Sequence, residues 1–412
     1  MGRPPLFGGA GQSRRSLPVV DNAGVVTAAE PRFRFDAREW SGAFADLGVL
    51  VPIAVALIVV NGLSPTAVLL PAGLLYITSG LIYRVPIPVQ PLKAFGAIAI
   101  AQGLGPQVIA AGALLMGAIF VILGATGAVD RAARLVPRPI IRGVQLSVGL
   151  LFAKLAFDLV ANTPAAFVDR AFGTGWLVTA AVAAAVVLLV ARRHPVALVL
   201  VLIALVLVAV RSPGPLVLGP APMTPASPTG TDLITALLVL VIPQLPLTFA
   251  NACLATADAA QAYFPQAAGR VSAGRLATSL GLANLLAGAV TGMPVCHGAG
   301  GLTAHRAFGA RSGGAPIIIG VILVAVALGI GGSVGLLLTR FPVSILAALM
   351  AVAGALHIAL LRDLAGRRAW VFALAVGVVG VWVNLAVAVL GGLILWWLAP
   401  GRTQSTSGFT SQ

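Results

Sequence analysis

Two short segments place polar side chains between prolines and glycines in an otherwise apolar chain. Residues 87–93 read Ile-Pro-Val-Gln-Pro-Leu-Lys, and residues 293–301 read Met-Pro-Val-Cys-His-Gly-Ala-Gly-Gly. Each segment follows one apolar run and precedes another. Paired interruptions of this kind mark substrate sites in transporters, because unwound backbone at membrane depth has to line a cavity. The helices that restart after the interruptions have free N–H groups at their starts, and such groups attract anions.

Lys93 and Asp46 are the charged side chains that could act at such a site. Lys93 follows Pro91 by two residues, just inside the helix expected to restart there. A cation within a membrane costs about 2.5–3.5 kcal/mol on insertion scales, so it needs a partner. Lys93 could bind an anion or form a structural pair with Asp46. Asp46 could bind a proton and couple it to transport, or be a structural carboxylate, and both alternatives stay open.

Other ionisable residues favour structural roles. Lys154 and Asp158 are four residues apart, which predicts an ion pair on one helix face. Asp258 ends an apolar span, close to the expected membrane surface, and is therefore expected to be structural, with proton binding as the alternative.

Gln244, Thr248 and Asn251 form a polar stripe within an apolar span. They are four and three residues apart and so share one helix face. Such a stripe either joins helices by hydrogen bonds or faces a substrate, and the residues alone slightly favour the first role.

Cys296 and His297 are two soft metal ligands side by side, but no CxxC or HxxxH spacing accompanies them, so we expect no metal site. His297 is placed to donate to a substrate or to carbonyl groups freed by the break in the helix. Gly298, Gly300 and Gly301 would let backbone approach a ligand closely.

The composition is that of a membrane protein. The chain is 59% hydrophobic and 9% charged, with a mean hydropathy of +1.03, whereas globular domains carry about 25% charged residues. We expect residues 1–40 to be a basic cytoplasmic tail without a signal peptide, and residues 401–412 to be a second cytoplasmic tail. No catalytic triad, phosphate loop or metal spacing occurs, so neither an enzyme nor a cofactor is expected.

Fourteen spans can be assigned, seven on each side of a Pro/Ser/Gly-rich linker at residues 212–231. They are 41–60, 66–83, 91–104, 107–127, 139–160, 173–191, 195–210, 232–256, 272–292, 299–309, 315–337, 342–360, 369–383 and 385–399. Because seven is odd, residues 232–400 would enter the membrane inverted relative to residues 41–211. The third and tenth spans are short and follow the two interruptions.

The basic residues orient this arrangement. With both termini cytoplasmic, only Arg170, Arg211 and Arg340 of the arginines fall on the outer side, as the positive-inside rule requires. The net charge of +15 is thereby explained without a nucleic-acid partner.

Several blocks together resemble the molybdate transporter family, a distant branch of the sulfate permease group. These blocks are residues 44–48, 86–93, 243–248, 293–301 and 308–313, and the resemblance extends over nearly all of residues 36–400. It implies an all-α membrane fold of seven plus seven inverted repeats, in which spans 1–4 and 8–11 form a core domain and spans 5–7 and 12–14 a gate domain. It also implies a substrate site between the third and tenth spans, made by Gln90, Pro91, Lys93, Gln244, Thr248, Cys296, His297 and Gly298.

The function implied by this resemblance is uptake of molybdate, with sulfate or tungstate next, at the plasma membrane. We expect an elevator-like motion of the core, a homodimer formed through the gate and possible proton coupling at Asp46. The alternatives are a nucleobase or organic-anion carrier of the same fold and a passive anion channel.

Overall fold

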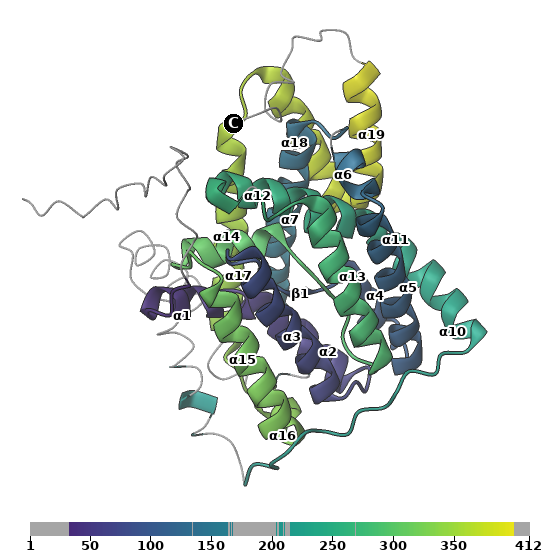
Figure 1. Ribbon diagram of the computed structural model, residues 1–412, viewed down its shortest axis with the longest axis vertical. Coiled ribbons are helices and arrows are strands. Elements are labelled where there is room, and N and C mark those ends of the chain that lie inside the picture. The colour runs from purple at the N-terminus through teal and green to yellow at the C-terminus, as the bar shows by residue number, and fades with distance from the viewer. Residues whose placement is uncertain are drawn as a thin grey trace, which may run out of the picture.

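The computed structural model describes residues 33–133, 135–163, 215–267 and 269–398, with a few separate residues between 165 and 210. The predicted spans 173–191 and 195–210 lie wholly or mostly outside these residues, as do residues 1–32 and the tail 401–412. The fold is a bundle of helices (Figure 1), and the other twelve predicted spans all coincide with described helices.

In the first half the helices are α1 (Ala37–Phe44), α2 (Leu47–Val59), α3 (Pro65–Tyr83), α4 (Lys93–Ala101), α5 (Pro106–Ala125), α6 (Ala128–Ala133) and α7 (Arg138–Ala161). Asp36 caps α1 by accepting from the N–H groups of Arg38 and Glu39. Prolines in the first turn start α3, α5 and α7, where a missing N–H costs nothing.

The second half begins with one long helical segment, Gly230–Tyr263. It comprises α10 (Gly230–Thr235), the π-helical η1 (Ala236–Val241), α11 (Ile242–Leu247), the π-helical η2 (Thr248–Ala255) and α12 (Thr256–Tyr263). The helices that follow are α13 (Ala273–Ala289), α14 (Ala299–Ala307), α15 (Gly314–Gly329), α16 (Gly331–Leu338), α17 (Val343–Ile358), the 3-10 turn η4 (Ala359–Asp363), α18 (Arg367–Val379), the π-helical η5 (Gly380–Asn384) and α19 (Leu385–Leu398).

Two helix pairs cross at glycines, and the two crossings correspond to each other. α3 packs along α15, where a Cβ added to Gly73 would lie 2.9 Å from the carbonyl oxygen of Gly320. α5 packs along α13, where a Cβ added to Gly117 would lie 2.9 Å from the carbonyl oxygen of Gly281. In the predicted order of spans, α3 and α13 are second in their halves, and α5 and α15 are fourth. Exchanging the halves therefore maps one crossing onto the other.

α3 and α13 also run in opposite directions. Thr66 at the start of α3 and Ala289 at the end of α13 both hydrogen-bond to the linker, at 2.8 Å and 3.0 Å. At the other ends of these helices, the Tyr83 hydroxyl donates to the carbonyl oxygen of Arg275 (2.9 Å). Corresponding spans that run antiparallel are what an inverted repeat requires.

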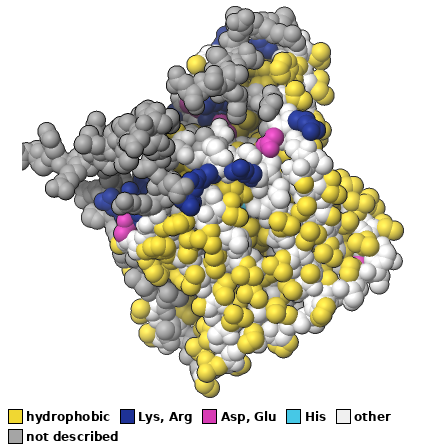
Figure 2. Space-filling view, in the orientation of Figure 1, with side chains coloured by type: hydrophobic (Ala, Val, Ile, Leu, Met, Phe, Trp, Pro, Cys, Tyr) yellow, Lys and Arg dark blue, Asp and Glu magenta, His cyan; other side chains and the backbone are white. Residues whose placement is uncertain are grey.

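Several helices are long and apolar enough to cross a membrane. Among the described residues, four helical segments are long and apolar enough to cross a membrane, and six if two bent pairs each count as one span. One bent pair is α15 and α16. The chain bends by 112° between them, where a single continuous span was predicted. Figure 2 shows hydrophobic side chains over the lower half of the visible face and Lys and Arg across its upper half.

Candidate functional site

The two interrupted segments pair with each other at the centre of the fold. Strand β1 (Gln90–Pro91) lies antiparallel to β2 (Val295–Cys296), with Gln90 opposite Cys296. The ladder continues from the N–H of Leu92 to the carbonyl oxygen of Pro294 (3.1 Å). The prolines favour this extended geometry because a residue before proline avoids the helical region. α4 and α14 then begin directly after the strands, so both helix N-termini are held at one place.

Gly298 allows the start of α14 to approach the first interruption. A Cβ at this residue would lie 2.2 Å from Gln90 Oε1 and 3.6 Å from Lys93 Nζ. Any larger residue would push Gln90 away. The two helix starts and the Lys93 ammonium group therefore lie within a few ångströms of one another.

A hydrogen-bonded chain links Lys93 to Asp46. Lys93 Nζ donates to Gln90 Oε1 (2.6 Å), and Gln90 Nε2 donates to Asp46 Oδ1. Tyr76 donates its hydroxyl to Asp46 Oδ2 (2.9 Å), and His305 Nε2 lies 4.0 Å from the same oxygen. The lysine and the carboxylate are thus joined through an amide, and no direct ion pair forms between them.

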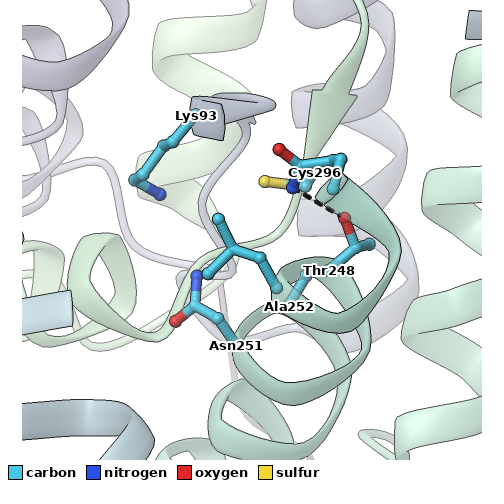
Figure 3. Close-up of a pocket in the computed structure, with 7 residues that line it drawn as sticks. Lys93, Thr248, Asn251, Ala252 and Cys296 are labelled. Carbon is cyan, nitrogen blue, oxygen red and sulfur yellow. Dashed lines mark hydrogen bonds between the residues drawn. The ribbon is translucent and has the colours of Figure 1, made fainter. Parts of the chain in front are cut away.

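A narrow cavity lies between the paired strands and the long helix of the second half (Figure 3), and in this conformation its side chains leave no space for a water molecule. The residues that line it are Lys93, Gln244, Leu247, Thr248, Asn251, Ala252 and Cys296. Lys93 Nζ also lies 5.3 Å from the centre of the Phe152 ring on α7, within cation–π range. Four of the eight predicted substrate residues therefore share one cavity.

Gln244 holds the first turn of α4. Its Oε1 accepts from the backbone N–H of Phe95 (2.9 Å), one of the N–H groups that a helix start leaves without an internal partner. Its Nε2 donates to Thr248 Oγ1 (2.9 Å). The polar stripe thus joins two helices and at the same time borders the cavity.

The other predicted site residues hold the two interrupted segments together. Cys296 Sγ lies 3.8 Å from the carbonyl oxygen of Pro91. His297 is fully buried, with Nδ1 2.9 Å from the carbonyl oxygen of Pro88 and Nε2 2.8 Å from Ser279 Oγ. Four predicted site residues lie beside the cavity without lining it: Gln90, Pro91, His297 and Gly298. Their contact with a substrate stays a prediction.

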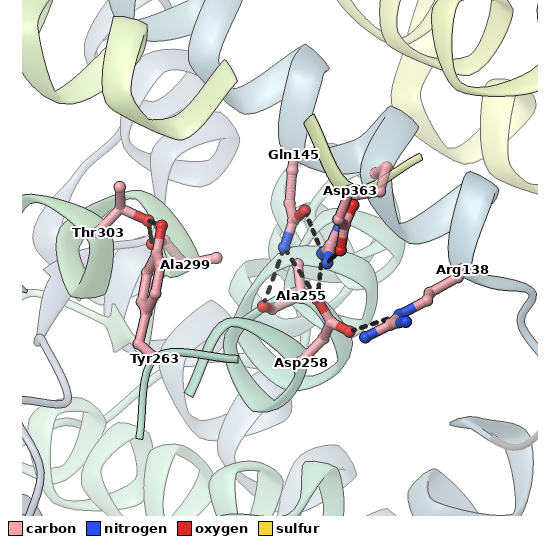
Figure 4. A network of polar contacts seen from close by, with 9 residues as sticks. Arg138, Gln145, Ala255, Asp258, Tyr263, Ala299, Thr303 and Asp363 are labelled. Atoms are coloured by element: carbon pink, nitrogen blue, oxygen red, sulfur yellow. Dashed lines mark hydrogen bonds and ion pairs between the residues drawn. The ribbon is translucent and has the colours of Figure 1, made fainter. Parts of the chain in front are cut away.

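Arg142 joins Gln145, Asp258 and Asp363 in a second polar cluster, and these three partners can be followed in Figure 4. Its guanidinium group donates to Asp363 through two nitrogens, to Asp258 and to Gln145 Oε1. Arg138 lies 3.9 Å from Asp258. Burial raises the pKa of Asp363, but hydrogen bonds and charge from Arg142 outweigh this and hold the pKa below its usual value of 3.8. Asp258 is therefore ion-paired, which agrees with the structural role expected for it, and the predicted ion pair of Lys154 with Asp158 is present (2.5 Å).

Sequence reasoning missed Tyr76, His305, Phe152 and Asn284. Asn284 holds β2 by bonding both the N–H and the carbonyl group of Val295, each at 2.7 Å. The chain has only three tyrosines and four histidines, so a polar ring in an apolar span was a usable signal for Tyr76 and His305. No sequence signal distinguishes Phe152 from the other phenylalanines.

Comparisons with known proteins show what this chain is similar to. A family model described as "Molybdate transporter of MFS superfamily" matches residues 38–152 and 236–356. Molybdate transporter 2 of Arabidopsis thaliana is 32% identical over 361 residues, which cover 77% of this chain and 77% of that protein. Molybdate transporter 1 of Arabidopsis thaliana is 30% identical over 420 residues, 91% of each.

Solved structures show the same fold. The transmembrane domain of the cyanobacterial bicarbonate transporter BicA superimposes with a TM-score of 0.54 at 17% identity, over 86% of this chain and 97% of that chain. Murine Slc26a9, an anion transporter solved in the inward-facing state, gives a TM-score of 0.60 at 14% identity, over 90% of this chain and 69% of that chain.

Proposed function

This chain belongs to the molybdate transporter family and is a multi-pass membrane protein, and we propose that it is a secondary active transporter that imports molybdate. The observation that carries this proposal is the cavity bordered by Lys93 at the point where α4 and α14 begin. A cavity lined by a buried cation at one helix start, with a second helix start beside it, suits a small anion. Sulfate and tungstate, which share the tetrahedral shape, are the next candidates.

The charges at the site favour a coupled proton. Molybdate is a dianion at neutral pH, and two helix N-termini of about +0.5 each together with Lys93 supply about +2. An ionised Asp46, linked to Lys93 through Gln90, would cancel one of these charges. A proton bound at Asp46 would restore the balance. Such compensation assists uptake because an opposing membrane potential costs about 2.3 kcal/mol per charge per 100 mV.

The motion that we propose is elevator-like, with both termini cytoplasmic and the protein in the plasma membrane. The crossings of α3 with α15 and of α5 with α13 would make the core one rigid unit. α7, with α17 and α18 packed against it, would form part of the gate and of a homodimer contact. The cavity would then travel with the core past the gate.

Uptake of radioactive molybdate into proteoliposomes tests the function. We expect saturable uptake that competing sulfate reduces, that uracil leaves unchanged and that an inward proton gradient accelerates. Competition by uracil without competition by sulfate would favour a nucleobase or organic-anion carrier. Flux that neither saturates nor accumulates anion against a gradient would indicate a passive channel.

A further inference from the structure

We infer that the cavity distinguishes tetrahedral oxyanions by whether an oxygen carries a proton, and that Asn251 is the residue that sets this preference. The inference rests on the proposed function in one respect, namely that an oxyanion binds in this cavity. It goes further in naming the class of anion accepted, which is the dianion without a proton, and the class rejected, of which hydrogenphosphate is the example.

Asn251 differs from the other buried amide side chains of the described residues. Gln90, Gln145, Gln244 and Asn284 each bond through both ends of the amide, and Asn61 bonds through its nitrogen. Asn251 is 2% exposed and lines the cavity, yet neither end of its amide has a hydrogen bond to a described residue. A buried amide without a partner is costly unless a ligand completes it.

The hydrogen bonds around the cavity leave donors facing it. Because Gln244 Oε1 is occupied by the N–H of Phe95, its nitrogen must be the end that reaches Thr248. Thr248 Oγ1 therefore accepts, and its hydroxyl proton is available to a ligand. Lys93 gives one of three ammonium protons to Gln90 and cannot accept any. The helix starts of α4 and α14 add only N–H groups.

Acceptors are scarce in the same place. None of the residues that line the cavity is a carboxylate. Asp46, the carboxylate linked to Lys93 through Gln90, already accepts from Gln90 and from Tyr76. The Asn251 amide has no bond to hold it, so it can turn its nitrogen toward an anion whose oxygens all accept. A hydrogenphosphate ion carries one proton on an oxygen. Either this proton faces a donor of the cavity, or Asn251 turns its amide oxygen toward the proton. In the second case the amide nitrogen no longer donates to the other oxygens of the ion.

The test is competition for binding to the purified protein, with sulfate, hydrogenphosphate and fluorophosphate as probes in mildly alkaline buffer. All three are tetrahedral dianions, and fluorophosphate carries fluorine where hydrogenphosphate carries a hydroxyl group. We expect fluorophosphate to compete nearly as well as sulfate and hydrogenphosphate to be at least about tenfold weaker, the effect of one unpaired buried donor. Equal competition by fluorophosphate and hydrogenphosphate would overturn the inference.

Two variants assign the preference to Asn251. Asn251→Asp supplies an acceptor and should bring hydrogenphosphate level with sulfate or above it. Asn251→Leu removes both ends of the amide, so it should weaken sulfate most and bring sulfate closer to hydrogenphosphate. The inference would also be overturned if Asn251→Asp preferred sulfate over hydrogenphosphate as strongly as the unaltered protein does. The thermal midpoint of Asn251→Asp should match that of Asn251→Leu, which shows that the variant is folded. Binding of sulfate reports on the selectivity even if molybdate does not bind, so failure of the proposed function is a distinguishable result.

Discussion

Lys93 donates a hydrogen bond to an uncharged partner, Gln90. Its ammonium group is held by Gln90 and by the ring of Phe152, so its charge is not cancelled by direct contact with a carboxylate. We expect Lys93→Ala to weaken molybdate binding by about tenfold or more, because a hydrogen bond to a charged group contributes about 1.5–3 kcal/mol. Equilibrium binding to purified protein measures this. Lys154→Ala is the matched control, since Lys154 is exposed and paired with Asp158, and it should bind normally. Equal loss in both variants would contradict a role at the site.

Asp46 offers a second prediction at this scale. Asn in its place still has an oxygen to accept from Tyr76 or Gln90 but cannot be ionised. We therefore expect Asp46→Asn to keep molybdate binding and to lose the pH dependence of accumulation. Uptake into proteoliposomes across a range of external pH measures this. Accumulation with the same pH dependence as the unaltered protein would make Asp46 a structural carboxylate.

The residues at the break could be predicted because polar side chains beside prolines are conspicuous in an apolar chain. What could not be predicted is which of them face the cavity. His297 and Cys296 are neighbours in the sequence, yet Cys296 lines the cavity and His297 bonds to Pro88 and Ser279. Their orientation depends on the pairing of β1 with β2, which joins residues about 200 positions apart. No local pattern encodes a contact of that range.

At the scale of elements, α7 meets the end of the long second-half helix through Arg142. The arginine side chain is 1% exposed and separates Asp258 from Asp363. We expect Arg142→Leu to destabilise the protein by about 3 kcal/mol or more, because it leaves two carboxylates facing each other in a partly buried place. Arg138→Leu is the matched control on the same helix. Its side chain is 68% exposed and 3.9 Å from Asp258, so it should cost less than about 1 kcal/mol. Thermal unfolding in detergent compares the two, and similar midpoints would contradict the prediction.

The positions of most helices could be predicted from the lengths of the apolar runs, but the bends within the helices could not. α15 and α16 were expected as one span, and their 112° bend falls at the Gly329–Ile330–Gly331 junction. Gly332 beside this junction bonds through its N–H to the carbonyl oxygen of Gly219 in the linker (3.3 Å). The π-helical stretches η1 and η2 were equally unexpected, and Pro243 and Pro246 lie in the helix between them. Proline removes a backbone donor, and wider turns restore the hydrogen bonds around it.

At the scale of the whole molecule, an elevator requires that contacts between core and gate be exchanged while contacts within the core persist. Gln145 of α7 reaches the carbonyl oxygen of Ala255 in η2 (3.4 Å), which lies across the proposed boundary. Thr66 of α3 donates to the carbonyl oxygen of Ala327 in α15 (3.0 Å), a contact within the proposed core. We expect a short cross-link between cysteines at 145 and 255 to stop molybdate uptake, and one between cysteines at 66 and 327 to permit it in folded protein. Uptake that persists with 145 joined to 255 would refute sliding at this boundary.

The pairing of β1 with β2 also has a consequence for how the protein is made. The strands lie on opposite halves of the chain, so the backbone groups of residues 87–92 have no ladder partner until the second half has left the ribosome and entered the membrane. Unpaired backbone in lipid is costly, and a contact of such range closes slowly. The first half should therefore be a target for membrane proteases during synthesis. Residues 1–211 and 212–412 expressed as separate chains should each be degraded alone and should accumulate when produced together.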